Sequence, residues 1–444
     1  CSLEFPPDSD SIAQAIELQL NAIQTQLAQH QSIADLIHLP LLEDKPKTLN
    51  ETLKMKLCME FYEAAFYNGA SNLILLTALN LVNLSLRYGN CKESSFGYVL
   101  YGMYLVDQRD FQQGYDFGNL ALQVLHQLND SVMLPKVRNL FCNYINYHLQ
   151  PFSSNADFYC ENIQLSRFNG EIIFGVWATI FYIWSLFLSG KPLQKIYQES
   201  EKYWPLTQQT NDHKMIKVLQ LLQLVILSFQ GKMSSPVQLK TESLTVKDLV
   251  QFWQDHNFIN GLTWYALLHG QLLYSYGFYA EAIEVMQTYA QELSPNIIMF
   301  PVSQYYVYYP LALLAVYPQV SESDQRKFDQ IIEESLHKLE EWQRYCPANF
   351  QSPHLLLCAE LAQVRGDRTI AMDWYDQAIL AAQTHQNLFQ QALANERAGI
   401  FWLTHHKSEF ASIHLSKAYY QYQLWGAEGK VKDLANKYPH LLVE

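Results

Sequence analysis

The chain has 444 residues, of which 49% are hydrophobic and 16% charged, so it has enough apolar surface for a folded core and is not globally disordered. Its formal net charge of -13 disfavours nucleic acid and anionic membranes as partners. The seven cysteines are scattered without a CxxC pair, which is typical of reduced thiols in a cytoplasmic protein. No apolar run is long enough to span a bilayer.

Apolar residues recur at helical spacing along the whole sequence, and turn signals separate the segments. The first helices are predicted from capping residues such as Asp8 and from the stop signal at Gly89-Asn90. No alternation typical of a β-strand is present, so the predicted class is all-α. In chain order the predicted helices are 8–30, 49–67, 71–88, 94–107, 111–128, 134–148, 155–167, 172–188, 193–204, 215–230, 246–255, 261–276, 279–293, 299–315, 323–345, 353–365, 368–384, 389–405, 408–425 and 429–437.

Small residues recur at a fixed spacing on successive helices. Ala359, Ala371 and Ala378 are 12 and then 7 residues apart, and the same offsets return in Gly399, Ala411 and Ala418. A partial copy is Gly270 with Ala282, and a weaker one is Gly102, Gly114 and Ala121. Such spacing, with a turn between the first two positions, is typical of two antiparallel helices that cross closely in a tetratricopeptide repeat. The sequence therefore predicts an α-solenoid of tetratricopeptide-like helical hairpins.

The pattern is less regular in the N-terminal half of the chain. We expect one continuous solenoid with an irregular part over residues 1–245 and a regular part over residues 246–444. The polar segment 231–241 precedes the change, and we expect it to be the least ordered interior loop. Because the chain begins with Cys1 instead of Met, we also expect it to be an excised or processed piece of a longer protein.

Several segments resemble one family beyond the generic repeat. The stretches that carry the resemblance are Val82–Asn90, Ser95–Gly102, Gly114–Gly118 with Ala121-Leu122, Leu311–Pro318, Ala394–Ala398, Ala418–Ala427, Lys430–Leu434 and Lys437–Pro439. Together they resemble the helical-repeat region of large bacterial, mainly cyanobacterial, multi-sensor signalling proteins. In that family a serine/threonine kinase-like domain and a STAND-type AAA ATPase precede the repeats, and a GAF domain and a histidine kinase follow them. The sequence itself contains neither a phosphate-binding GxxxxGK[ST] loop nor the kinase HRD and DFG motifs.

The resemblance implies a non-catalytic region that binds proteins or flanking domains of the same polypeptide and relays signals between modules. We expect no enzymatic activity, no cofactor and no metal site in this chain. An alternative from a different class is a helical sensor domain that binds a small apolar or aromatic ligand.

The first helix of each tetratricopeptide hairpin usually presents residues to a concave groove. This predicts a partner groove with an apolar and aromatic lining, although a neighbouring helix could equally cover these side chains. The aromatic segment 305–310 is a further candidate shelf, and at least half of its rings must pack in the core. The candidate groove residues are Phe96, Val99, Met103, Trp264, Leu267, Gln271, Tyr274, Tyr305 and Tyr308.

Two other clusters have simpler interpretations. The pair His405-His406 lies in a predicted turn, where a capping role is favoured over a metal or phospho-acceptor site. Glu333, Glu334, Glu340 and Glu341 alternate with Lys338 and Arg344 at helical spacing, which indicates a solvated, ion-paired face. No arrangement of a nucleophile with a base can be recognised.

Overall fold

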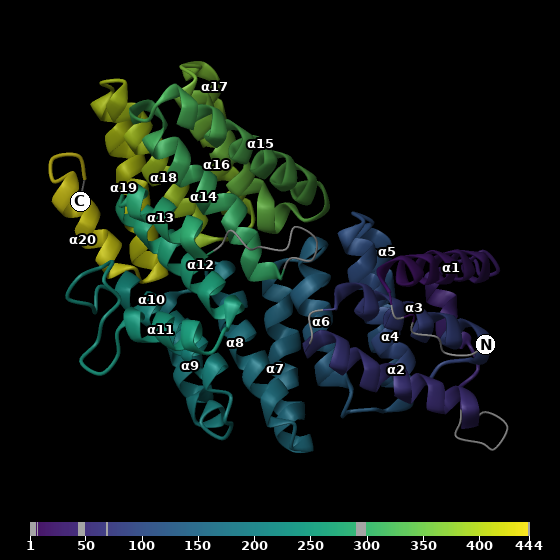
Figure 1. Ribbon diagram of the computed structural model, residues 1–444. Coiled ribbons are helices and arrows are strands. Elements are labelled where there is room, and N and C mark those ends of the chain that lie inside the picture. Colours follow the sequence, from purple (N-terminus) through teal and green to yellow (C-terminus); the bar gives the residue numbers. More distant parts are fainter. Residues whose placement is uncertain (1–5, 7, 43–48, 68–69, 290–298, 443–444) are drawn as a thin grey trace. The chain divides into compact units, whose positions relative to one another are not determined.

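A computed structural model describes residues 6, 8–42, 49–67, 70–289 and 299–442, and these residues are almost entirely helical (Figure 1). Within them the only β-type pairings are two isolated bridges, Leu41 with Asn90 and Lys240 with Thr245. None of the described helices has the length and hydropathy of a membrane span. The predicted all-α class is therefore confirmed. Cys1 and residues 290–293 of one predicted helix lie outside the described residues.

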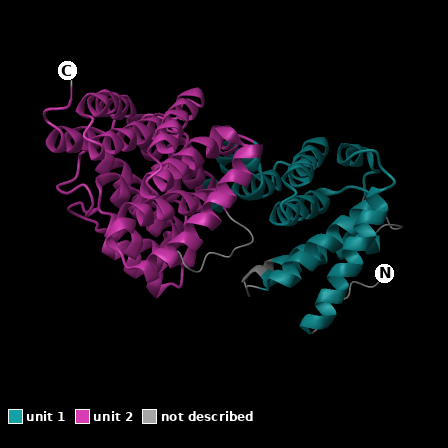
Figure 2. Cartoon of the chain, turned by 90° about the horizontal axis from the view of Figure 1, so that it is seen from above, with its two compact units in different colours: residues 1–149, 161–175 teal, residues 150–160, 176–444 magenta. Residues whose placement is uncertain are grey.

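The chain forms two compact units (Figure 2). Unit 1 comprises residues 1–149 and 161–175, and unit 2 comprises residues 150–160 and 176–444. This division is based on contacts in space, whereas the boundary predicted near residue 245 concerns the regularity of the repeats. That predicted boundary stays a prediction.

Unit 1 contains six complete helices, part of a seventh and the first residues of an eighth. They are α1 (Ser9–Leu27), α2 (Leu49–Tyr67), α3 (Ser71–Tyr88), α4 (Lys92–Asp107), α5 (Phe111–Leu128), α6 (Leu134–Tyr144), the C-terminal part of α7 (Phe152–Asn169) and the start of α8 (Ile172–Leu188), with short 3-10 helices at Ile33–His38 and Asn146–His148. Successive helices pack against each other, most extensively α4 against α5.

Unit 2 continues with the remainder of α7 and α8 and then the following helices, which again pair in succession. They are α9 (Leu193–Thr207), α10 (His213–Phe229), α11 (Val246–Asp255), α12 (Ile259–Tyr276), α13 (Tyr279–Tyr289), α14 (Tyr305–Val316), α15 (Glu322–Tyr345), α16 (Pro347–Val364), α17 (Arg368–Thr384), α18 (Leu388–Thr404), α19 (Ser408–Trp425) and α20 (Glu428–Lys437), with 3-10 helices at Phe300–Gln304 and Tyr317–Gln319. The tightest pairs are α16 with α17 and α18 with α19.

Two predicted helix ends are wrong because each was placed at a proline. The helix expected to begin at Pro353 begins at Pro347, and Pro353 lies inside it. The helix expected to end before Pro205 continues to Thr207. A proline is tolerated at the first helical position because an N–H there would have no acceptor within the helix, and one inside a helix is tolerated where packing stabilises the remaining turns.

The small residues of the repeat lie where paired helices touch. A Cβ added at Gly102 of α4 would lie 2.7 Å from the carbonyl oxygen of Gly114 in α5, and one added at Gly114 would lie 2.8 Å from the carbonyl oxygen of Gly102. In unit 2, Ala359, Ala371 and Ala378 are fully buried, as are Ala411 and Ala418. The spacing read from the sequence therefore marks close helix crossings.

Helices far apart in the sequence also meet inside unit 2. The Asn349 side chain in α16 accepts from the Phe152 N–H and donates to the Gln150 carbonyl, and Asn387 donates to the Leu188 carbonyl. The Phe229 ring packs 5.1 Å from that of Trp425 in α19. The early helices of unit 2 are thus covered by its last ones.

The loop between α10 and α11 is anchored at two points. The Leu239 side chain is fully buried, and the Val237 carbonyl lies 2.8 Å from Nε2 of His269. Since a carbonyl can only accept, Nε2 donates, and Nδ1 is then able to accept from the Tyr265 hydroxyl at 3.1 Å. Neutral His269 can therefore form both of these hydrogen bonds at once.

We expect Gly102→Val to destabilise unit 1 by about 1–3 kcal/mol, because the new side chain meets the backbone of α5. Urea unfolding followed by circular dichroism measures the change. Gln123→Val, on the exposed side of α5, is the control. Equal stability of the two variants would contradict the assigned crossing.

We expect stability to fall as the pH decreases below the ordinary histidine range, and His269→Gln to remove part of that fall. Burial lowers the pKa of His269, partly opposed by its hydrogen bond to Val237. In the unfolded chain, His269 then binds a proton at a pH where it stays neutral in the folded protein. The free energy of unfolding is therefore highest above the pKa of His269 in the unfolded chain, and it decreases as the pH falls toward the pKa in the folded protein. Urea midpoints at pH 7 and 5 measure the slope, with exposed His440→Gln as control. An unchanged slope in His269→Gln would exclude this contribution.

Candidate functional site

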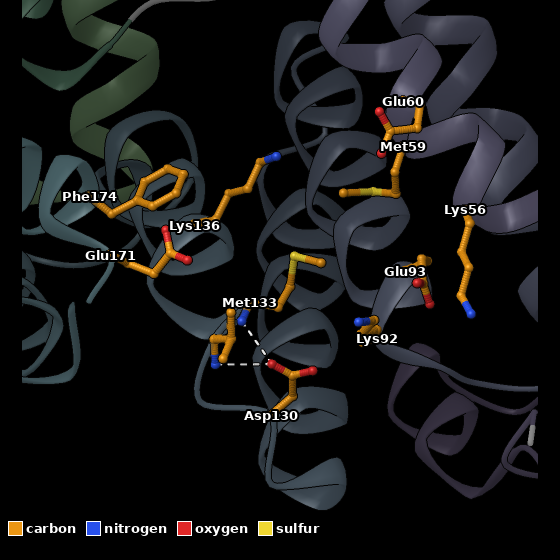
Figure 3. A pocket seen from close by; sticks show the side chains of 11 residues that line it. Lys56, Met59, Glu60, Lys92, Glu93, Asp130, Met133, Lys136, Glu171 and Phe174 are labelled. Carbon is orange, nitrogen blue, oxygen red and sulfur yellow. Dashed lines mark hydrogen bonds between the residues drawn. The ribbon is translucent and has the colours of Figure 1, made fainter. Parts of the chain in front are cut away.

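Unit 1 contains a hollow of about 400 Å³ on the side formed by its even-numbered helices (Figure 3). Ligand-binding clefts in proteins are commonly about 300–1,000 Å³. The lining residues come from α2, α4, the turn before α6, α6 itself and the start of α8. They are Lys56, Met59, Glu60, Lys92, Glu93, Asp130, Val132, Met133, Lys136, Glu171 and Phe174.

A short turn holds the apolar rim of this hollow in place. Asp130 Oδ1 accepts hydrogen bonds from the backbone N–H groups of Val132, at 3.1 Å, and Met133, at 2.8 Å (Figure 3). An aspartate that binds the N–H groups two and three residues later stabilises a turn that leads into a helix. The Val132 side chain is 56% exposed, so it is available to a bound molecule.

One lysine of the lining, Lys136, lies over buried aromatic rings. The Phe96 ring is fully buried and packs edge-to-face on Tyr62, with centroids 4.7 Å apart. The Lys136 ammonium lies 4.8 Å from the Phe96 ring centroid, which is within the distance of a cation–π contact. The lining of the hollow therefore combines seven charged residues with four apolar ones.

The predicted groove residues are for the most part inside the protein. Met103 and Tyr305 remain partly exposed. The other seven are buried, so the prediction that they present their side chains on an open face is wrong. That they contact a partner stays a prediction, and such contact would require the covering helices to move. The buried ones are Phe96, Val99, Trp264, Leu267, Gln271, Tyr274 and Tyr308.

Packing within unit 2 explains the burial of those that belong to it. Trp264 of α12 meets Phe181 of α8 edge-to-face at 5.8 Å. Tyr274 packs against Tyr308 at 6.1 Å, and Tyr305 stacks on Tyr309 at 5.0 Å. In unit 2 the face that a regular repeat array leaves open is thus filled by helices of the same unit.

The other two candidate clusters behave as surface features. His405 and His406 follow α18 in its turn, and His406 has a left-handed backbone with φ of 56°. Lys338 pairs with Glu334 and Arg344 with Glu340, which is the predicted ion-paired face. Among the described residues, no group of three or more His, Cys, Asp or Glu side chains could hold a metal ion.

Sequence reasoning missed a set of buried charges in unit 2. Arg397 of α18 binds Glu360 of α16 through two hydrogen bonds of 2.7 Å, and it donates to the Tyr279 hydroxyl at 2.8 Å. Glu360 is 2% exposed and Arg397 is 7% exposed. Burial acts to lower the pKa of Arg397, but Glu360, Tyr274 and Tyr279 together raise it above its ordinary value.

A second buried pair ties α20 to the same helices. The fully buried Lys430 ammonium donates to Glu396 at 2.8 Å, to Asp433 at 3.0 Å and to the Ser275 carbonyl at 2.6 Å. Burial alone would lower the pKa of Lys430, and the two carboxylates raise it above its ordinary value. Charges flanked by buried alanines, as in Ala394-Asn395-Glu396-Arg397-Ala398, are the signal that could have revealed this network.

Comparison with known proteins supports the repeat assignment. A family model described as "CHK1-like, TPR repeats" matches residues 251–425, from α11 to the end of α19. No curated protein matches the chain. Among solved structures, "Crystal Structure of Rap Protein Complexed with Competence and Sporulation Factor" is 12% identical, covers 96% of this chain and 100% of that chain, and has a TM-score of 0.37. That TM-score is too low to support an argument. Together with the observed hairpins, the family model shows that the fold is tetratricopeptide-like.

We expect Arg397→Met to destabilise unit 2 by about 3–5 kcal/mol, because it leaves the Glu360 carboxylate buried without its cation. Urea unfolding measures the loss. Arg344→Met, which breaks an exposed ion pair, is the matched control and should cost no more than about 0.5 kcal/mol. Adding Glu360→Met to Arg397→Met should recover part of the stability. Similar losses in Arg397→Met and Arg344→Met would show that the buried pair is not structural.

Proposed function

We propose that this chain is a non-catalytic, cytoplasmic protein-interaction scaffold, the signal-relay region of a bacterial multidomain signalling kinase or ATPase. The tetratricopeptide-like hairpins support the scaffold part, since repeats of this kind generally bind other polypeptides. The resemblance of segments such as Ala394–Ala398 to the repeat region of multi-sensor proteins motivates the signalling part.

The observation that carries the proposal is the hollow of unit 1. Its lining carries lysines and carboxylates together, so it suits a segment with charges of both signs, and its rim at Val132 and Met133 offers apolar contact. A polypeptide segment with apolar residues and charges of both signs fits this mixture better than a nucleic acid does, because Glu60, Glu93 and Glu171 share the lining and would repel phosphates. We propose that a segment of a partner protein, or of a flanking domain of the same polypeptide, binds in this hollow.

Site-specific photo-crosslinking in the native cell tests the proposal. We expect a photoreactive residue at Val132 to yield one discrete crosslinked polypeptide, because this side chain lies at the rim and is exposed. Lys136→Glu should reduce that yield by about tenfold, since it reverses one charge of the lining. A photoreactive residue at Gln123, on the outer side of α5, is the control. The same products from Val132 and Gln123, unaffected by Lys136→Glu, would contradict a binding role for the hollow.

A further inference from the structure

Helix α19 exposes a row of large apolar side chains on its outer side. The four members are Phe410, Ile413, Tyr420 and Leu424, which are 50%, 52%, 60% and 47% exposed. With Lys417 between them, they are spaced by 3, 4, 3 and 4 residues. At 100° per residue these five positions lie within an arc of about 80° and extend over about 21 Å. We call these five residues the α19 seam.

The opposite side of the same helix supplies the core. Ala411, Leu415, Ala418, Tyr422 and Trp425 are fully buried against neighbouring helices. The seam is therefore a second apolar face, and Phe410 at its N-terminal end also stacks on Trp402 of unit 2. Spacing of 3 and 4 residues is the pattern by which one helix packs along another in a coiled coil.

The repeat itself does not require this face to be apolar. Helix α17 is the preceding copy, forty residues earlier, and three of its five equivalent positions are polar. The equivalent positions on α5 are polar at four of five. These positions are Ile370, Asp373, Gln377, Leu380 and Thr384 on α17, and Gln113, Asp116, Leu120, Gln123 and Gln127 on α5. The composition of the seam thus differs from that of the equivalent positions on α17 and α5.

Lys417 decides between the possible occupants. It is the middle member of the seam, it is exposed, and in the described part of the chain it forms no ion pair. If two copies of the seam paired in register around a two-fold axis, the two Lys417 side chains would face each other, whether the helices ran parallel or antiparallel. That repulsion disfavours a second copy, whereas an acidic residue opposite Lys417 would pair with it and fix the register.

We propose that the α19 seam binds an amphipathic α-helix of a partner protein, with an acidic residue at the centre of that helix's apolar face. The inference rests on the proposed scaffold function and adds to it a second surface and the chemistry of its ligand. Phe410 extends the seam at its N-terminal end by stacking on Trp402, with centroids 4.9 Å apart. Apolar anchors on both sides of a single charge give a helix both affinity and register.

Two synthetic helical peptides of three heptads test the proposal. Both carry leucine at every seam-facing position except the central one. The central residue is glutamate in the first peptide and lysine in the second. Fluorescence anisotropy with the whole chain measures the affinity. We expect the glutamate peptide to bind with a Kd of about micromolar and the lysine peptide to bind about tenfold more weakly. In Lys417→Glu the preference should reverse.

Variants on two helices locate the binding. We expect Ile413→Asp and Leu424→Asp to weaken the glutamate peptide by at least about tenfold. Leu380→Asp, on α17 and 62% exposed, is the matched control and should have no effect. Circular dichroism confirms that each variant is folded, as expected for substitutions of exposed residues.

Several results would overturn the seam. Three of them come from the peptides: neither peptide binds, Leu380→Asp weakens binding as much as Leu424→Asp does, or Lys417→Glu still prefers the glutamate peptide. The fourth is self-association of the chain that Ile413→Asp abolishes, since this result would make a second copy the occupant. The crosslinking at Val132 is independent of α19. If the peptides do not bind but Val132 still yields its crosslink, only the inference about the seam is refuted. If the crosslink is absent, the proposed use of the hollow is refuted.

Discussion

The close crossing of paired helices is the constraint on which the rest of the structure depends. At Gly102 and Gly114 the backbones of α4 and α5 are in contact, and the buried alanines of the later pairs serve the same purpose. Because no side chain separates the helices there, each hairpin is thin, and its large residues point to the next pair. The hairpins then stack through aromatic and aliphatic side chains, and the position of every surface follows from this stacking.

Much of the fold could be predicted because each helix crossing requires small residues at a fixed spacing within one hairpin. The 12 and 7 residue offsets of Ala359, Ala371 and Ala378 depend on residues within one hairpin, so they can be read from the sequence alone. Helix ends at prolines were less predictable: Pro353 is compatible with a helix start and with a helix interior, and only the packing of α16 selects the interior. The division into two units depends on contacts between distant residues, which no local pattern records.

The candidate site was harder to predict for the same reason. Trp264 and Tyr274 have the composition expected of a groove, but Phe181 and Tyr308, distant in sequence, cover them. The hollow of unit 1 is lined by charged residues from five separate segments, and none of these segments forms a motif by itself. The buried pair of Arg397 with Glu360 could have been suspected only from charges among alanines. The apolar row on the outer side of α19, by contrast, can be recognised from its spacing of 3 and 4 residues once the helix and its buried face are known.

The hydrogen bonds that connect the two ends of unit 2 have a consequence for how it folds. Asn387 reaches Leu188 and Asn349 reaches Gln150, each across 199 residues, and Lys430 reaches Ser275 across 155 residues. In an open repeat array each hairpin contacts only its neighbours, so folding can begin anywhere and spread. Here the last helix provides contacts that the earlier helices need, so unit 2 completes its fold only after its C-terminus has been synthesised. Such long sequence separations also slow folding and join the hairpins into one cooperative transition.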